Sequence, residues 1–205
     1  MRKRSPSLHG NAPDRARVAV LVIDVINDFD FPGGERLARR ARPMARPLAT
    51  LLGRARRAEV PVIYVNDNFG RWRSNFPSLI EHCAASRGAH LTALLRPESD
   101  DYFVLKLKHS AFYASPLELL LESLGVDPLI LTGLTAESCV FFTACDAYLR
   151  DFRIVIAPDC VVSGDASRKR AALDHLRSIL RATIRASSHI AFPARGRRKS
   201  RRPAR

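Results

Sequence analysis

The sequence lacks the features that would place the chain in a membrane or outside the cell. No apolar run approaches the ~20 residues that a membrane-spanning helix requires. The first residues, MRKRSPSLHGNAPDRAR, contain no apolar stretch of the kind found in a secretory signal. The four cysteines form no CxxC pair and no regular spacing, so neither a disulfide framework nor a structural zinc site is expected. We therefore expect a cytoplasmic protein with reduced thiols and no membrane partner.

Phosphate-binding loops are missing as well. The chain contains neither a GxGxxG nor a GxxxxGK[ST] segment, which are the loops that cradle nucleotide phosphates in α/β proteins. We therefore expect no nucleotide, and no other cofactor.

Positive charge is abundant but unevenly placed. The net charge is +14, and seven basic residues stand in the last eleven positions, with Arg2, Lys3 and Arg4 at the other end. We expect residues 1–16 to form a basic flexible segment and residues 194–205 a basic disordered tail. No aromatic residues are interleaved with the C-terminal charges, so base stacking has no support. Nucleic acid is expected only as a nonspecific partner of these tails.

The remaining residues, 17–193, have the composition of one globular domain. The whole chain has 205 residues, of which 46% are hydrophobic. Hydrophobic patterns predict strands at 18–23, 60–66, 102–107, 129–131, 153–157 and 188–192, with helices at 44–58, 78–94, 116–124, 136–149 and 166–186. Pro43 and Pro47 are expected to confine the first helix, and Gly133 to end the fourth strand. The alternation predicts an α/β fold: a single-domain, doubly wound (Rossmann-like), mostly parallel six-stranded sheet with helices on both faces.

Cys139 follows the fourth strand, in the first turn of a predicted helix. Unpaired amides and the positive end of the helix dipole favour a thiolate there, which is the nucleophilic form of cysteine. The equal alternative is that Cys139 is one more small buried apolar residue.

Two charged residues stand at the carboxyl ends of other strands. Asp24 directly follows the first strand, where it can either transfer protons or cap a loop. Lys106 lies near the end of the third strand, on the same face as Lys108, and either lysine can simply extend its ammonium group to solvent. In a doubly wound sheet Asp24, Lys106 and Cys139 converge on the crevice where such folds bind ligands.

Three segments resemble the signature blocks of the isochorismatase-like cysteine hydrolases, which include nicotinamidases, carbamoylsarcosine amidohydrolases and ureidoacrylate hydrolases. They are VLVIDVINDF, KLKHSAF and TGLTAESCVFFTACDAYLRDF, and the resemblance spans about Val18 to Ala186. It implies that residues 17–193 form an isochorismatase-like hydrolase domain with Asp24, Lys106 and Cys139 as its catalytic triad. Lys106 is preferred to Lys108 because it stands four residues before Ser110, as the family's lysine does.

The resemblance also implies the local structure around the nucleophile. The family has a non-proline cis peptide shortly before its cysteine, which corresponds here to Leu134–Thr135. That geometry would aim the amides of Thr135 and Cys139 at an oxyanion.

Departures from the family pattern narrow the activity that the resemblance implies. Metal-dependent nicotinamidases carry an Asp-x-His pair after the second strand, whereas this chain reads Asn66-Asp67-Asn68, so no metal is expected. Members that cleave a vinyl ether tend to lack the cysteine. The expected activity is hydrolysis of a small amide or ureido compound through a thioester; vinyl-ether hydrolysis and non-catalytic binding of a small molecule are the alternatives. The expected pocket residues are Phe29, Asn66, Trp72, Phe112 and Tyr113, and the family implies a homo-oligomer, a dimer or larger.

Overall fold

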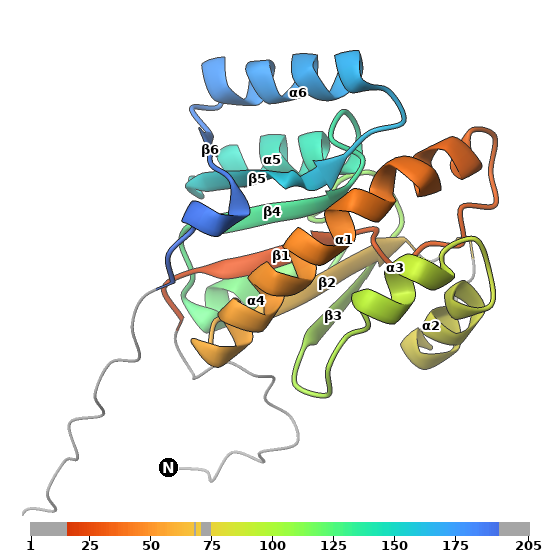
Figure 1. The fold of residues 1–205 in the computed structure, drawn as a ribbon. Helices are drawn as coiled ribbons and strands as arrows, with labels where there is room; N and C mark the ends of the chain where they lie inside the picture. The colour runs from red at the N-terminus through yellow and green to blue at the C-terminus, as the bar shows by residue number, and fades with distance from the viewer. Residues whose placement is uncertain (1–15, 68, 71–74, 193–205) are drawn as a thin grey trace, which may run out of the picture.

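The computed structural model describes residues 16–67, 69–70 and 75–192. Six strands form one sheet in the order β3-β2-β1-β4-β5-β6, and every neighbouring pair is parallel (Figure 1). The strands are β1 Ala19–Ile23, β2 Val62–Asp67, β3 Tyr102–Lys106, β4 Leu129–Leu134, β5 Ile154–Val162 and β6 Thr183–Ile184. The predicted C-terminal tail, and all but residue 16 of the predicted N-terminal segment, lie outside the described residues.

Helices cover both faces of this sheet (Figure 1). They are α1 Gly34–Arg57, α2 Phe76–Ala84, α3 Ala89–Leu94, α4 Leu117–Leu124, α5 Cys139–Tyr148 and α6 Ala166–Ser178, with a short 3-10 helix, η2, at Ser187–His189. Apolar side chains of α1, α2 and α3 pack in one core cluster, and those of α4, α5 and α6 pack in a second. The predicted α/β fold with helices on both faces is confirmed.

The central strand β1 joins the two core clusters. All five of its residues are buried; Val20 and Val22 belong to the cluster of α1, whereas Leu21 and Ile23 belong to that of α5. An uninterrupted apolar run is what a strand covered on both faces requires. Because the strand order reverses between β1 and β4, their carboxyl ends open the crevice in which such folds bind ligands.

Helix α1 is longer than predicted. It begins at Gly34 instead of residue 44 and continues through Pro43 and Pro47. Each internal proline costs a helix about 3 kcal/mol. The apolar stripe that faces the sheet is long enough to offset this cost, since each fully buried Leu or Met contributes about 1.5–3 kcal/mol. Its buried members are Leu37, Ala38, Ala41, Met44, Ala45, Leu48, Leu51, Leu52 and Ala55.

The predicted helix over 78–94 is also wrong, because the chain forms two helices there. The break lies at Gly88, where an added Cβ would stand 1.7 Å from the carbonyl oxygen of Asn27. Only glycine permits this close approach. The turn between α2 and α3 therefore packs directly on the loop between β1 and α1.

Two predictions near the C-terminus are also wrong. The last helix ends at Ser178, not at residue 186, and the sixth strand is Thr183–Ile184, whereas 188–192 contains part of η2. Ser187 donates both its backbone N–H and its hydroxyl to the carboxylate of Asp159. This contact from β5 fixes a turn where the apolar pattern alone indicated a strand.

Gly133 does not end β4 as predicted but lies inside it. Its φ is 111°, and an added Cβ would stand 2.0 Å from the carbonyl oxygen of Ile23. The glycine therefore lets β4 approach β1 closely at the residue before Asp24. The neighbouring β5 shifts register at the same level and extends to Val162, five residues beyond the predicted end. In the part of the chain that the structure describes, no helix is both long and apolar enough to cross a membrane.

Candidate active site

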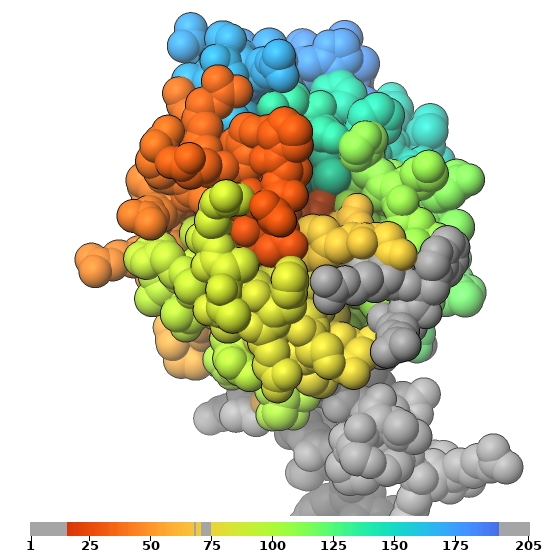
Figure 2. Space-filling model, turned by 90° about the vertical axis from the view of Figure 1, so that its right-hand side faces the viewer, coloured from red at the N-terminus to blue at the C-terminus, as the bar shows by residue number. Residues whose placement is uncertain are grey.

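Asp24, Lys106 and Cys139 meet at the carboxyl edge of the sheet. Figure 2 views this edge, and the surface is hollowed between the segments that follow β1, β3 and β4. The Nζ of Lys106 lies 2.8 Å from Oδ2 of Asp24 and 3.6 Å from Sγ of Cys139. The structure thus brings together the three residues that the sequence selected.

The Asp24 carboxylate is held from two sides. The residue adopts a left-handed conformation, with φ 52°, and its N–H donates to the carbonyl of Val65 at 2.9 Å. Its Oδ1 accepts the N–H of Asp67 at 2.8 Å, while Oδ2 faces the Lys106 ammonium. These contacts fix the carboxylate at the carboxyl ends of β1 and β2.

Lys106 is buried, with only 1% of its side chain exposed. Its ammonium also donates to the carbonyl of Lys108 at 3.1 Å and lies 3.9 Å from Oδ2 of Asp67. A buried ammonium is tolerated because carboxylates and a carbonyl surround it. Lys106 is therefore not a surface lysine that reaches solvent, whereas Lys108 is exposed.

Cys139 is the first residue of α5 and follows the expected cis peptide between Leu134 and Thr135. The carbonyl of Thr135 accepts the N–H groups of Ser138 and Val140, which shapes the turn into the helix. The amide of Cys139 belongs to the first turn, whose N–H groups have no acceptor inside the helix. The oxyanion role of the Thr135 and Cys139 amides stays a prediction.

The surroundings of Cys139 do not favour a resting thiolate, contrary to the expectation from its helix position. Burial and the nearby Asp24 carboxylate raise the pKa of the Cys139 thiol to about 12, although Lys106 opposes both. Burial also raises the pKa of the Asp24 carboxyl, against the lowering effects of Lys106 and Cys139. The thiol is therefore protonated at rest, beside a carboxylate that is more basic than usual.

A proton can nevertheless move from the Cys139 thiol to the Asp24 carboxylate. Losing the thiol proton to solvent would leave two buried anions beside one cation, which explains the high pKa of the thiol. Transfer of the same proton to Asp24 keeps the charge of the group unchanged. The resulting thiolate would lie 3.6 Å from the Lys106 ammonium. The geometry thus suits attack by sulfur coupled to proton transfer.

Replacing Asp24 with asparagine should lower the pKa of the Cys139 thiol. The substitution removes the anion that opposes thiolate formation and keeps the Lys106 ammonium that favours it. Iodoacetamide labelling against pH, read by peptide mass spectrometry, should therefore give a lower apparent pKa for Cys139 in Asp24→Asn than in the wild type. Cys145 is the internal control and should label alike in both proteins. An unchanged or higher apparent pKa for Cys139 would refute this electrostatic description.

The predicted pocket residues have different positions. Trp72 lies outside the described residues. Phe29 and Phe112 are buried, and the Phe112 ring packs beneath the Arg150 guanidinium at 4.8 Å and beside the Phe152 ring. Tyr113 is 58% exposed. None of these contacts tests whether the aromatic residues bind substrate.

Asn66 supports the neighbouring loop. It is fully buried, and its side-chain amide donates to the carbonyl of Ile26 at 2.7 Å and accepts the N–H of Ile26 at 3.2 Å. Both ends of the amide are occupied by the backbone after β1. This side chain therefore fixes the loop that carries Asp24 and Phe29.

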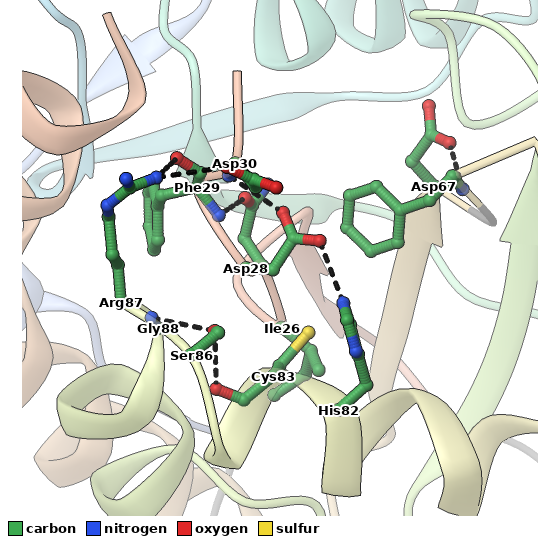
Figure 3. Close-up of polar contacts among 12 residues, drawn as sticks. Ile26, Asp28, Phe29, Asp30, Asp67, His82, Cys83, Ser86, Arg87 and Gly88 are labelled. Carbon is green, nitrogen blue, oxygen red and sulfur yellow. Dashed lines mark hydrogen bonds and ion pairs between the residues drawn. The ribbon is translucent and has the colours of Figure 1, made fainter.

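Polar contacts to α2 and the α2–α3 turn hold the far part of the same loop (Figure 3). Asp28 Oδ2 lies 3.0 Å from Nε2 of His82, and Arg87 reaches both the carboxylate of Asp30 and the carbonyl of Phe29. These residues come from segments more than fifty positions apart. Hydrogen bonds and ion pairs therefore connect the loop between β1 and α1 to α2 and to the turn between α2 and α3.

Sequence reasoning did not select two residues that the structure brings to the triad. Asp67 orients Asp24 through its N–H, and Nδ1 of His109 lies 3.7 Å from Sγ of Cys139. His109 belongs to the KLKHSAF segment, so its position three residues after Lys106 was the available signal. Among the described residues, no group of three or more His, Cys, Asp or Glu side chains is arranged to hold a metal ion.

Comparison with known proteins gives one family. A model of the Isochorismatase domain matches residues 18–188. The uncharacterized isochorismatase family protein YaaI of Bacillus subtilis is 36% identical over 176 residues, which cover 86% of this chain and 97% of the relative. Ureidoacrylate amidohydrolase RutB of Methylobacterium radiotolerans is 28% identical over 195 residues, covering 82% of this chain and 76% of the relative.

A solved structure agrees with these relatives. The N-carbamoylsarcosine amidase of Thermoplasma acidophilum superposes with a TM-score of 0.65 at 28% identity, over 85% of this chain and 98% of that protein. Proteins similar to this chain thus include amidohydrolases with the same fold.

Proposed function

The chain belongs to the isochorismatase family, and we propose that it is a cysteine-dependent hydrolase of small, non-peptide amide or ureido compounds. The observation that carries the proposal is the contact of Sγ of Cys139 with the buried Lys106–Asp24 ion pair. A sulfur nucleophile and a carboxylate base that both contact one cation suit covalent acyl transfer. Asp24, Lys106 and Cys139 form the proposed catalytic triad.

In the first half of the proposed reaction, Asp24 takes the thiol proton while Sγ attacks the carbonyl carbon. The negative charge then moves to the substrate oxygen, where the amides of Thr135 and Cys139 are the proposed donors. The C–N bond breaks, and Asp24 returns its proton to the departing nitrogen. Lys106 stays charged throughout and keeps the carboxylate and the sulfur in register. The products are a thioester on Cys139 and free ammonia or an amine.

The substrate class is supported by the relatives as well as by the site. The names of two similar proteins, a ureidoacrylate amidohydrolase and an N-carbamoylsarcosine amidase, describe hydrolysis of small molecules at a ureido or carbamoyl group. A planar carbonyl with a nitrogen leaving group is the substrate that the triad can use. A small ureido acid or carboxamide therefore fits the proposal best.

The raised pKa of Asp24 also fits a second function, which is hydrolysis of a vinyl ether. In that reaction the carboxyl group would protonate the substrate directly, and Cys139 would take no part. The contact between Lys106 and the sulfur has no use in such a reaction, so the thioester mechanism accounts for more of the site.

A panel of small primary amides and ureido acids tests the proposed function directly. We expect ammonia release from at least one of them with the wild-type protein, and none above background with Cys139→Ala. Vinyl ethers belong in the same panel. Cleavage of a vinyl ether, without ammonia release from any amide, would overturn the proposal in favour of the second function.

A further inference from the structure

His109 contacts the proposed nucleophile in addition to Lys106. Its Nδ1 lies 3.7 Å from Sγ of Cys139, which is a hydrogen-bonding distance for sulfur, and the side chain is exposed. The Lys106 ammonium, at 3.6 Å from the same sulfur, is buried. The sulfur thus contacts both a buried ammonium and an imidazole that faces solvent.

The position of the imidazole is fixed by a neighbouring ring. His109 stacks on Phe142 of α5, with ring centroids 5.5 Å apart and an interplanar angle of 28°. Phe142 lies one helical turn after Cys139, so the same helix carries the sulfur and the surface that holds the imidazole. The packing of His109 on Phe142 of α5 therefore holds the imidazole near Cys139.

The hydrolytic half of the proposed reaction needs a base in this region. Water must attack the thioester carbon, which is bonded to Sγ. Asp24 can take the thiol proton from within the buried group, but only 8% of its side chain is exposed to water that enters from solvent. Asp67 is more open, but its Oδ1 accepts the N–H of Phe69 at 2.7 Å. Among the residues that the structure describes, the His109 imidazole touches the sulfur and also faces solvent.

We propose that His109 is a further catalytic residue, the general base that activates water for hydrolysis of the Cys139 thioester. This inference rests on the proposed function, because it requires the thioester to form. It divides the proton transfers between two residues: Asp24 serves the formation of the thioester, and His109 serves its hydrolysis.

The proton and electron pairs balance without a further reactant. Nδ1 takes a proton from water as the water oxygen bonds to the carbonyl carbon. When the C–S bond breaks, its electron pair returns to sulfur, and the imidazolium gives its proton to that sulfur. Cys139 is again a thiol and His109 is again neutral. The product leaves as a carboxylic acid, or as a carbamic acid when the substrate is a ureido compound, and ionises in solvent.

An activated ester tests this step without knowledge of the natural substrate. p-Nitrophenyl acetate should acetylate Cys139, with one rapid release of p-nitrophenolate per protein, and the acetyl group should then be lost by hydrolysis. The variants are His109→Gln, which keeps a polar side chain, and His109→Phe, which keeps a ring on Phe142. The matched control is His90→Gln, an exposed histidine of α3.

In both His109 variants we expect the initial release to stay near the wild-type rate and the acetyl group to be lost about 10²-fold more slowly. Mass spectrometry of the isolated acetyl-protein gives the rate of loss. Hydroxylamine, a strong nucleophile that needs no base, should clear the acetyl group equally fast from all proteins. His90→Gln should behave as the wild type.

Two results would overturn the role of His109 without affecting the proposed function. Both variants could lose the acetyl group at the wild-type rate. Alternatively, acetylation and hydrolysis of the acetyl group could be slowed equally, which would indicate a structural role. Failure of the proposed function looks different. In that case the wild type and Cys139→Ala would give the same trace, with no acetyl group on Cys139, and the inference would fall with it.

Discussion

Replacing Cys139 with alanine is expected to lower amide turnover by about 10⁴-fold or more, because the substitution removes the atom that forms the covalent bond. The protein should stay folded, since the sulfur is only partly buried and alanine suits the first turn of α5. Ammonia release by the purified variant, with a substrate found in the panel, gives the measurement. Cys145→Ala, on the same helix, is the matched control and should keep wild-type turnover.

Asp24→Asn should lower turnover nearly as far, because both proton transfers in the formation of the thioester pass through this carboxylate. Residues that act as one unit give non-additive losses, so the double variant should be scarcely slower than either single variant. A Cys139→Ala protein with most of its activity, beside an inactive Asp24→Asn protein, would defeat the thioester mechanism. The isochorismatase fold would be unaffected by that result.

The second large effect is on stability. Lys106→Met is expected to lower the free energy of unfolding by about 3–5 kcal/mol, because it leaves the Asp24 carboxylate buried without its cation. Methionine keeps the apolar stem of the lysine, so little of the loss comes from packing. Urea denaturation gives the free energy from the midpoint and slope of the transition.

Two further variants show whether the charge is responsible for this loss. Lys106→Met combined with Asp24→Asn removes both charges and should be more stable than Lys106→Met alone. Arg39→Met breaks the exposed pair with Glu35, whose side chains are 65% and 70% exposed, and should cost about 1 kcal/mol or less. Equal losses in the single and the double Lys106 variants would show that packing, and not an uncompensated charge, sets the stability here.

Sequence patterns were sufficient where one physical effect dominates. The apolar run of β1 and the first half of β4 are buried on both faces, so hydrophobicity alone predicts them. The carboxyl ends of parallel strands share one edge of the sheet, which is why the positions of Asp24, Lys106 and Cys139 could be predicted without coordinates. The cis peptide at Leu134–Thr135 came from the family resemblance and is confirmed.

Other features depend on contacts between distant segments. The length of α1 reflects the sheet face that it covers, which outweighs the local effect of Pro43 and Pro47. The break at Gly88 depends on the carbonyl of Asn27, more than sixty residues away in the chain. The neighbouring residues in the sequence predict neither contact.

The electrostatic prediction failed for the same reason. Position at a helix N-terminus favours a thiolate, but burial and the carboxylate of Asp24 act on the same sulfur and raise its pKa. The contact of His109 with Cys139 likewise depends on stacking against Phe142, which no spacing rule contains. The sequence therefore located these side chains better than it predicted the pKa of the Cys139 thiol.

Acid quenching during turnover of an amide substrate, followed by peptide mass spectrometry, tests the central claim most directly. The account predicts that the acyl part of the substrate is attached to the peptide that contains Cys139, and that the adduct accumulates further in His109→Gln. Cys139→Ala should carry no adduct and release no ammonia. An unmodified Cys139 peptide in the wild type and in His109→Gln, together with undiminished ammonia release from Cys139→Ala, would contradict the thioester mechanism.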